Sequence, residues 1–340
     1  MRRIGEPMAI ACVDWRTADH GALAVLYADE IGRWSVALGW ETAASWDHIE
    51  LGRRLGTVPG LLAIDSSGAI VGWTFYLLHR EVLQIGGFAA LSELATTALL
   101  DGIFASEAAA HAQSVTVFVF SDAPGLSSAL TRRGLTVAAY DYLMKPLPGD
   151  AERSVADRIP SPDHPIEPPG ALRRWRPGDG PAVAALLGSA YPGANGVRPF
   201  APRGTVDEWQ EYVHQLVAEA GCGTIMPDGC YVVPAGLDRV SGVVLVTRLG
   251  EVTAHIAQLA VDPYAQRVGL GRLLVNAACA SATDAGCARI TLLVEGRNVA
   301  ARRLYEAFGF GAVARFVSAG NGQPRRLTSV AVGGGATTRP

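Results

Sequence analysis

The residues best suited to chemistry lie at one turn between an apolar segment and a helical pattern. Residues 256–261 are apolar and end at Asp262-Pro263, after which the chain reads Gln266-Arg267-Val268-Gly269-Leu270-Gly271. Paired glycines at a strand-to-helix turn let backbone N–H groups converge, and the N-terminus of the following helix adds partial positive charge. With Arg267 and Arg272 as counter-charges, the pattern predicts a pyrophosphate site. An ordinary glycine-bearing turn is the alternative.

The spacing excludes two other phosphate-binding motifs. A dinucleotide fingerprint would need its third glycine where the chain has Leu274, and no Gly-Lys-Ser/Thr follows as a P-loop would require. Leu270, Leu273, Leu274, Ala277 and Ser281 recur at helical spacing, and Gly286 is a stop signal. The turn is therefore predicted to open a helix that begins near Leu270.

Gln-x-x-Gly-x-Gly after a strand resembles the acetyl-CoA signature of the GCN5-related N-acetyltransferases, the GNAT superfamily. The downstream sequence also fits, with a strand at 289–294, then Asn298, and then the run 304–310 (Leu-Tyr-Glu-Ala-Phe-Gly-Phe). The resemblance covers roughly residues 171–317. It implies an α/β (α+β) fold with a mixed, mostly antiparallel sheet flanked by helices, and acetyl-CoA as the acyl donor.

The resemblance also implies which residues bind acetyl-CoA. In the family the strand before the signature diverges from its neighbour and pairs with the pantetheine arm, a role that here falls to the backbone of Leu259, Ala260 and Val261. A buried strand that contacts only core fits these side chains equally well. Asn298 would cap the downstream helix and contact the arm. The residues expected around the pyrophosphate are Gln266, Arg267, Val268, Gly269, Leu270, Gly271 and Arg272.

Two side chains are candidates for proton transfer. His255 lies where relatives often carry a catalytic Glu or His, and its ordinary pKa of about 6.5 suits a general base. Glu251 is the second candidate, and Gln258 could order a water or the acceptor. Tyr305 matches the tyrosine with which many relatives protonate the departing thiolate. The alternatives are a hydrogen-bonded histidine at a strand edge and a half-buried aromatic on an amphipathic helix.

Specificity for the acceptor is expected in residues 190–230, a long stretch rich in polar and aromatic side chains. Arg198 or Arg203 could bind a carboxylate or phosphate, and Asp207 or Glu208 could hold an amine. A solvated helix face is the alternative for such a run. The chemistry-bearing residues are Tyr191, Asn195, Arg198, Arg203, Asp207, Glu208, Trp209, Tyr212 and His214.

The chain contains a degenerate internal repeat. Trp175-Arg176 echoes Trp15-Arg16, and Phe308-Gly309-Phe310 echoes Arg133-Gly134-Leu135. We predict two GNAT-like copies, with a degenerate domain at 1–147, a proline-rich linker at 148–170, the catalytic domain at 171–320, and a strand remnant with a flexible tail at 321–340. Where the second copy has its glycines, the first reads LSELATTALLDG, and Leu130 replaces Tyr305. The first copy is therefore expected to support the fold or the acceptor cleft. A second, altered ligand site is the alternative.

Composition limits the partners. The 340 residues are 49% hydrophobic and carry a net charge of −3, so neither nucleic acid nor an anionic membrane is expected. Cys12, Cys222, Cys230, Cys279 and Cys287 form no Cys-x-x-Cys pair, so free thiols in a reducing cytoplasm are expected and no metal site is indicated. No export signal is evident at the N-terminus.

The leading hypothesis is direct transfer of an acetyl group from acetyl-CoA to the amine of a small molecule by the second copy. The tandem arrangement is similar to the mycothiol synthase branch of the superfamily, so a cysteinyl amino sugar is one acceptor to consider. A non-catalytic acyl-CoA-binding regulator and a protein N-acetyltransferase are the alternatives. A homodimer stays open.

Overall fold

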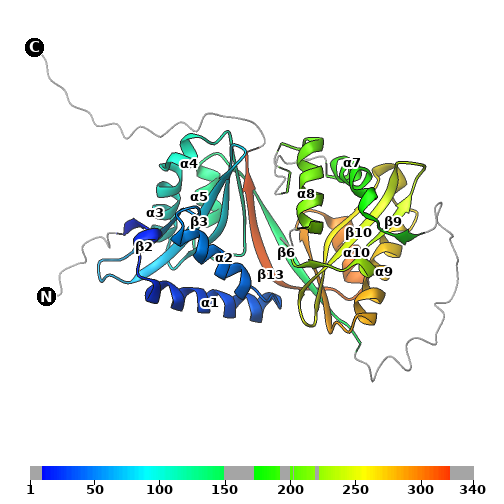
Figure 1. The fold of residues 1–340 in the computed structure, drawn as a ribbon, viewed down its shortest axis with the longest axis horizontal. Coiled ribbons are helices and arrows are strands. Elements are labelled where there is room, and N and C mark those ends of the chain that lie inside the picture. The colour runs from blue at the N-terminus through cyan, green and yellow to red at the C-terminus, as the bar shows by residue number, and fades with distance from the viewer. Residues whose placement is uncertain (1–9, 149–171, 192–199, 202, 219–221, 322–340) are drawn as a thin grey trace, which may run out of the picture.

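The computed structural model describes residues 10–148, 172–191, 200–201, 203–218 and 222–321. They form two copies of one arrangement that share a single sheet (Figure 1). We call residues 10–148 the first copy and residues 172–321 the second copy. The predicted linker and tail lie almost entirely outside the described residues, and the domain bounds stay a prediction.

The elements of the first copy are β1 (Ala11–Asp14), η1 (Trp15–Thr17), α1 (His20–Leu38), α2 (Ala43–Arg54), β2 (Gly60–Ile64), β3 (Ile70–His79), β4 (Val82–Ala90), α3 (Glu93–Phe104), α4 (Glu107–Ala110), β5 (Ser114–Val119), α5 (Leu126–Arg132) and β6 (Thr136–Pro146). The sequence pattern predicts a hairpin at 61–64 and 70–78 and strands at 82–89 and 115–120, and all of these are confirmed. The sequence pattern predicts one helix over 94–110; this is wrong, because the helix ends at Phe104 and the Ser106 side chain caps a separate turn.

The elements of the second copy are β7 (Arg173–Arg174), η2 (Pro177–Asp179), α7 (Gly180–Ala190), α8 (Val206–Ala218), β8 (Thr224–Ile225), η3 (Pro227–Gly229), β9 (Tyr231–Pro234), β10 (Val240–Gly250), β11 (Thr253–Val261), η4 (Pro263–Ala265), α9 (Leu270–Asp284), β12 (Arg289–Glu295), α10 (Val299–Ala307) and β13 (Gly311–Gly320). As predicted, α9 begins at Leu270 and stops just before Gly286, which has a left-handed φ of 76°.

The two copies repeat the same strand pairing. β1, β2, β3 and β4 pair antiparallel in succession, and β4 pairs parallel with β5. β7, β9, β10 and β11 likewise pair antiparallel, and β11 pairs parallel with β12. The predicted tandem of mixed, mostly antiparallel sheets is therefore confirmed.

The last strands cross between the copies. The strand order through the middle of the sheet is β5-β13-β6-β12, so β13 pairs with β5 of the first copy and β6 pairs with β12 of the second. Figure 1 shows β13 in red and β6 in green side by side between the two copies. Neither copy completes its sheet with its own strands alone.

Helices cover both faces of each copy. In the first copy α3 and α5 pack on one face, whereas Leu23, Tyr27 and Trp46 of α1 and α2 pack on the other. In the second copy α9 and α10 cover one face, and α7 and α8 cover the opposite one. Among the described residues, no helix combines the length and the apolar character that crossing a membrane requires.

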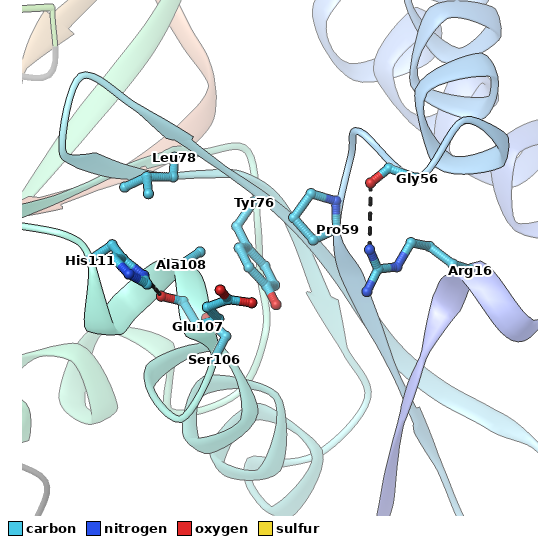
Figure 2. Close-up of a pocket in the computed structure, with 9 residues that line it drawn as sticks. All are labelled: Arg16, Gly56, Pro59, Tyr76, Leu78, Ser106, Glu107, Ala108 and His111. Carbon is cyan, nitrogen blue, oxygen red and sulfur yellow. Dashed lines mark hydrogen bonds between the residues drawn. The ribbon is translucent and has the colours of Figure 1, made fainter.

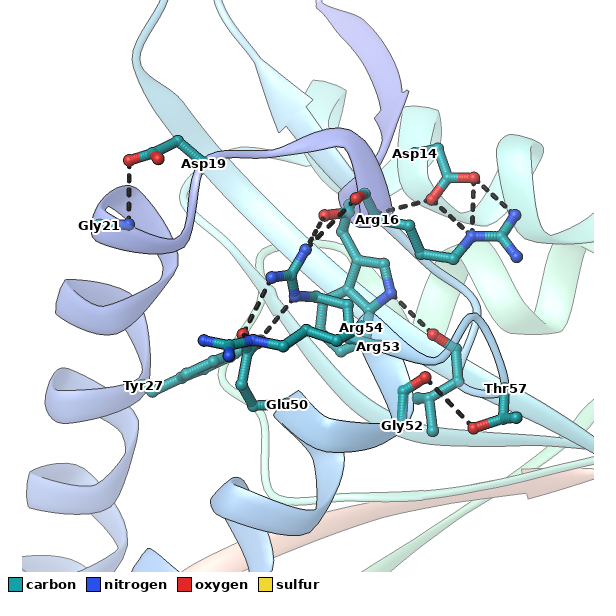
Figure 3. A network of polar contacts seen from close by, with 12 residues as sticks. Asp14, Arg16, Asp19, Gly21, Tyr27, Glu50, Gly52, Arg53, Arg54 and Thr57 are labelled. Atoms are coloured by element: carbon teal, nitrogen blue, oxygen red, sulfur yellow. Dashed lines mark hydrogen bonds and ion pairs between the residues drawn. The ribbon is translucent and has the colours of Figure 1, made fainter.

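A buried ion pair fixes α2 to the start of the first copy (Figure 3). Arg53, whose side chain is 5% exposed, pairs with Glu50 at 2.7 Å and donates to the carbonyl oxygen of Trp15 at 3.1 Å. The hydrogen bond from Arg53 is the main reason that the pKa of Glu50 is lowered. Tyr27 also donates to Glu50 at 2.9 Å, which links α1 to α2.

Candidate active site

The second copy contains an opening between two diverging strands. β11 and β12 pair only from Thr253 and Arg289 to Ile256 and Leu292, although the strands continue to Val261 and Glu295. On its other edge β11 stays paired with β10 up to Val261, after a bulge near residue 257. One edge of residues 257–261 therefore faces a gap instead of a neighbouring strand.

Two backbone groups in this segment point into the gap. The carbonyl oxygen of Leu259 accepts a hydrogen bond from Tyr191 Oη at 2.9 Å, and that of Val261 lies 3.4 Å from Gln266 Nε2. Because the N–H and C=O of one strand residue point to the same side, the amides of Leu259 and Val261 also face the gap. The alternation turns the backbone of Ala260 toward β10. Of the three predicted contacts, Leu259 and Val261 are therefore the ones whose backbone edge is not paired with another strand.

The glycine turn leaves the N-terminus of α9 open. Gly269 is its N-cap with a φ of 90°, and no side chain caps the first N–H groups. Arg267 also has a left-handed φ, 68°, a conformation that non-glycine residues rarely adopt. A Cβ on Gly271 would meet only Leu304, at 3.1 Å. Uncapped first-turn amides can bind an anion, and the pyrophosphate site predicted at this turn stays a prediction.

The matching turn of the first copy is closed. β4 and β5 diverge after Ile85 and Val117 much as β11 and β12 do. However, the Ser92 side chain accepts from the amide of Ala95 at 3.2 Å and so caps α3. Glu93 places a carboxylate in the first turn, against Gly125. A capped helix end with its own negative charge is unsuited to a pyrophosphate.

Tyr305 is buried on α10, in the core against which Leu259 and Val261 pack. Asn298 caps this helix, accepting from the amide of Ala301 at 3.1 Å, so its predicted capping role is confirmed. Tyr305 is 6% exposed and packs edge-on against Phe310. Burial, and secondly the charge of Tyr191, raise the pKa of Tyr305 above its ordinary value. A phenol with a raised pKa keeps its proton, so a proton is available there at neutral pH.

His255 is enclosed at the point where the two strands begin to diverge. It is 2% exposed, and burial lowers its pKa to about 3. Thr291 donates its hydroxyl proton to the carbonyl oxygen of Ala254 at 3.2 Å, so it receives the Nδ1–H of His255 at 2.9 Å. This assignment leaves the lone pair on Nε2. His255 is therefore neutral throughout the physiological pH range.

The two candidate catalytic residues lie on opposite faces of the sheet. Tyr305 belongs to the core that Ala254 and Ile256 share with α9 and α10. His255, between them in β11, packs on the other face, against Trp40 and Tyr142. Leu259 packs against the same core as Tyr305, and the carbonyl oxygen of Leu259 accepts from Tyr191. The gap between β11 and β12 is what joins the two faces.

Several predicted acceptor residues are engaged within the protein. Glu208 accepts from the amides of Arg203 and Gly204 and pairs with Arg203 Nε at 2.8 Å. Trp209 is buried and stacks on Tyr191. Tyr212 accepts from Gln258 Nε2 at 2.6 Å on the His255 side of the strand. Asp207 and His214 are exposed. Asn195 and Arg198 lie outside the described residues.

Sequence reasoning missed the residues that surround His255. Trp40 comes from the loop after α1, Tyr142 from β6, and Thr291 from β12. The sequence has an aromatic-rich stretch with Trp34, Trp40 and Trp46, but no local signal indicates that it reaches the second copy. The pairing of β6 with β12, which places Tyr142 beside His255, is a long-range register.

A surface pocket of about 440 Å³ lies elsewhere, on the first copy (Figure 2). Tyr76, Ser106, Glu107 and His111 line it together with Arg16, which bonds to the carbonyl oxygen of Gly56. It contains none of the predicted site residues. The diverging strands and the open α9 turn remain the candidate site.

Comparison with known proteins agrees with this geometry. Residues 194–310 match the acetyltransferase (GNAT) family. Mycothiol acetyltransferase from Sanguibacter keddieii is 30% identical over 207 residues, which is 59% of this chain and 61% of that protein. The one from Gordonia bronchialis is 36% identical over 112 residues, 31% of this chain and 35% of that protein. The chain thus spans about three fifths or less of these curated relatives.

Solved structures share the fold along the whole chain. A GCN5-related N-acetyltransferase from Sphaerobacter thermophilus gives a TM-score of 0.58 at 16% identity, covering 91% of this chain and 95% of that one. A tandem GNAT protein from the clavulanic acid biosynthesis pathway gives 0.50 at 13% identity, covering 92% and 98%. The motif and the family match place residues 194–310 in the acetyltransferase (GNAT) family, and the repeated strand pairing and these likenesses show a tandem arrangement of the same fold along the chain.

Proposed function

We propose that the second copy transfers an acetyl group from acetyl-CoA directly to the primary amine of a small molecule. The observation that carries the proposal is the contrast between the two helix N-termini. That of α9 is uncapped beside a strand edge that no neighbouring strand pairs with, whereas that of α3 is capped by Ser92 and flanked by Glu93. Only the former offers an anion site next to a place for an extended chain.

The proposed roles follow from burial and charge. The first-turn amides of α9, with Arg267 and Arg272, would bind the pyrophosphate, and the edges of Leu259 and Val261 would hold the pantetheine arm. Because Tyr191 Oη occupies the Leu259 carbonyl, its hydroxyl would move when the arm pairs there. A backbone N–H on this edge would face the carbonyl oxygen of the thioester as negative charge develops.

Proton transfer would use the two faces of the sheet. Attack by the amine nitrogen gives a tetrahedral intermediate whose nitrogen is positively charged and therefore acidic. His255, neutral with a free Nε2, would take this proton directly or through a water, so the amine must arrive deprotonated. Collapse of the intermediate breaks the carbon–sulfur bond, and Tyr305 would protonate the departing thiolate, because a phenol with a raised pKa keeps its proton at neutral pH.

Mycothiol acetyltransferase is the name of the curated relatives, so a cysteinyl amino sugar of the mycothiol type is the first acceptor to test. The assay is release of CoA thiol from acetyl-CoA with a panel of amines that includes this sugar, simple amino sugars and an N-terminal peptide. Peptide-dependent release would favour a protein acetyltransferase instead. Acetyl-CoA binding without thiol release for any amine would favour a non-catalytic acyl-CoA-binding protein.

The location of the donor site is tested by a matched pair of substitutions. Gly271→Asp and Leu94→Asp each place a carboxylate at the second position of a helix, α9 or α3. We expect Gly271→Asp to weaken acetyl-CoA binding by at least about tenfold, or roughly 1.4 kcal/mol, in calorimetry. Leu94→Asp should leave the affinity unchanged. Equal affinities of both folded variants would remove the donor site from the second copy.

A further inference from the structure

The loop between α1 and α2 of the first copy docks onto the hairpin that carries His255. The amide of Glu41 donates to the carbonyl oxygen of Leu249 at 3.0 Å. In return, the Glu41 carboxylate accepts from the amide of Glu251 at 2.8 Å. Gly39 adopts a left-handed φ of 69° and lies so close to Thr253 and Arg289 that a Cβ there would meet both within 3.3 Å. Two reciprocal hydrogen bonds and a close backbone approach make this a specific contact.

The docked loop inserts Trp40 against the imidazole. Trp40 meets His255 edge to face, with ring centroids 5.9 Å apart and an interplanar angle of 72°. Trp40 Nε1 donates to Tyr142 Oη at 2.6 Å, and Tyr142 donates to the carbonyl oxygen of Leu38 at 2.9 Å. The Tyr142 ring stacks on His255 at 5.9 Å. Two first-copy aromatic rings, fastened to each other, therefore enclose the imidazole.

We propose that Trp40 is a positioning residue for His255. Its indole excludes water from the histidine site. Together with Tyr142 it holds the imidazole in the orientation that keeps the hydrogen bond from Nδ1 to Thr291, so that Nε2 keeps its lone pair. The first copy thus contributes to the site without binding acetyl-CoA. This inference rests on the proposed function only for the role of His255, because the enclosure itself can be measured directly.

The other groups around the imidazole supply no negative charge that would stabilise protonated His255. Tyr142 on β6 and Tyr212 on α8 are phenols whose pKa values are raised by burial, so both stay neutral. Burial likewise raises the pKa of the Cys222 thiol, before β8, to about 12. Arg289 on β12 approaches Gly39 of the docked loop, and burial is the cause of the lowered pKa of His255. The Glu41 carboxylate is bound to the hairpin turn. Protonation of His255 is therefore governed by access of water.

The experiment follows the histidine Cε1–H signals by NMR between pH 4.5 and 8. The signal of His255 is the one lost in His255→Gln. It should not titrate in the wild type, whereas in Trp40→Ala it should titrate with a midpoint moved up toward about 6.5, the ordinary histidine value. Trp40→Phe keeps an apolar ring and should restore the non-titrating signal. Trp46→Ala removes a buried indole from the same copy, where Trp46 contacts Tyr27 and Trp73 instead, and should leave the signal unchanged.

A second pair of variants covers the case in which Trp40→Ala does not fold. Glu41→Ala removes the carboxylate that holds the loop, whereas Glu251→Ala removes a nearby charge but keeps its backbone amide. Solvent exchange of the His255 Nδ1–H should become at least about tenfold faster in Glu41→Ala and stay unchanged in Glu251→Ala, since exchange follows local opening.

The outcomes separate this inference from the proposed function. The positioning role would be overturned if the His255 signal does not titrate in folded Trp40→Ala. It would also be overturned if exchange of the His255 Nδ1–H is equal in Glu41→Ala and Glu251→Ala. If the signal titrates as expected but kcat/KM of Trp40→Ala gains no acid limb at the same midpoint, the positioning role stands and His255 is not the base. A matching acid limb that Trp40→Phe removes supports both.

Discussion

The burial of His255 predicts a specific loss of stability in mild acid. In the folded protein the pKa of His255 is lowered to about 3, whereas an unfolded chain has the ordinary value of about 6.5. Below pH 6.5 the unfolded state binds a proton that the folded state does not. The stability linked to this group is therefore complete above pH 6.5 and is lost progressively as the pH falls toward 3.

The size of the effect follows from the same two values. Each pH unit between them changes the free energy of unfolding by about 1.4 kcal/mol, so this group alone should remove about 2 kcal/mol on going from pH 8 to pH 5. Urea denaturation at the two pH values measures it. In His255→Gln, which cannot be protonated, the difference between pH 8 and pH 5 should be smaller by this amount.

The matched control is His214→Gln, because His214 is exposed on α8. That variant should keep the wild-type pH dependence. The reasoning would be refuted if wild type and His255→Gln lost the same stability between pH 8 and pH 5 to within about 0.5 kcal/mol, the usual effect of a surface substitution. In that case His255 would be hydrated in the folded protein.

Three further predictions concern the site and its attachment. Tyr305→Phe should lower kcat by roughly 10²–10⁴-fold while acetyl-CoA affinity in calorimetry stays unchanged, because the hydroxyl is needed as the thiolate leaves; a wild-type kcat would show that another group supplies this proton. His255→Ala should lower kcat/KM by a similar factor, roughly 10²–10⁴. It should not alter the pH profile between 5 and 8, since a pKa of about 3 lies below that range. An acid limb of the wild-type profile that disappears in the variant would mean that His255 is not buried. Asp141→Asn should lower the free energy of unfolding in urea by about 1–3 kcal/mol, because the buried Asp141 of β6 pairs with Arg302 of α10 and Arg315 of β13. Asp228→Asn, at an exposed pair, should lower it less. Equal losses would contradict a role of Asp141 in joining the copies.

The sequence by itself determined the family and the parts of the site that are local. The turn from Val261 to Gly271 is set by residues close together in the chain, since Gly269 needs a left-handed φ and α9 must start directly after it. The cap at Asn298 and the missing glycines in the first copy are local in the same way. Short-range geometry of this kind follows from residue type and spacing.

Only the tertiary structure decided what surrounds the reacting groups. The sequence predicts a base with an ordinary pKa at His255, because nothing near it in sequence removes water. The groups that do so come from a loop more than two hundred residues away and from β6, through a strand exchange that no local pattern encodes. The same exchange turns two copies that look separable in sequence into one sheet. Desolvation depends on everything that packs against a group, so it is fixed by long-range pairing and not by the residue or its neighbours in the chain.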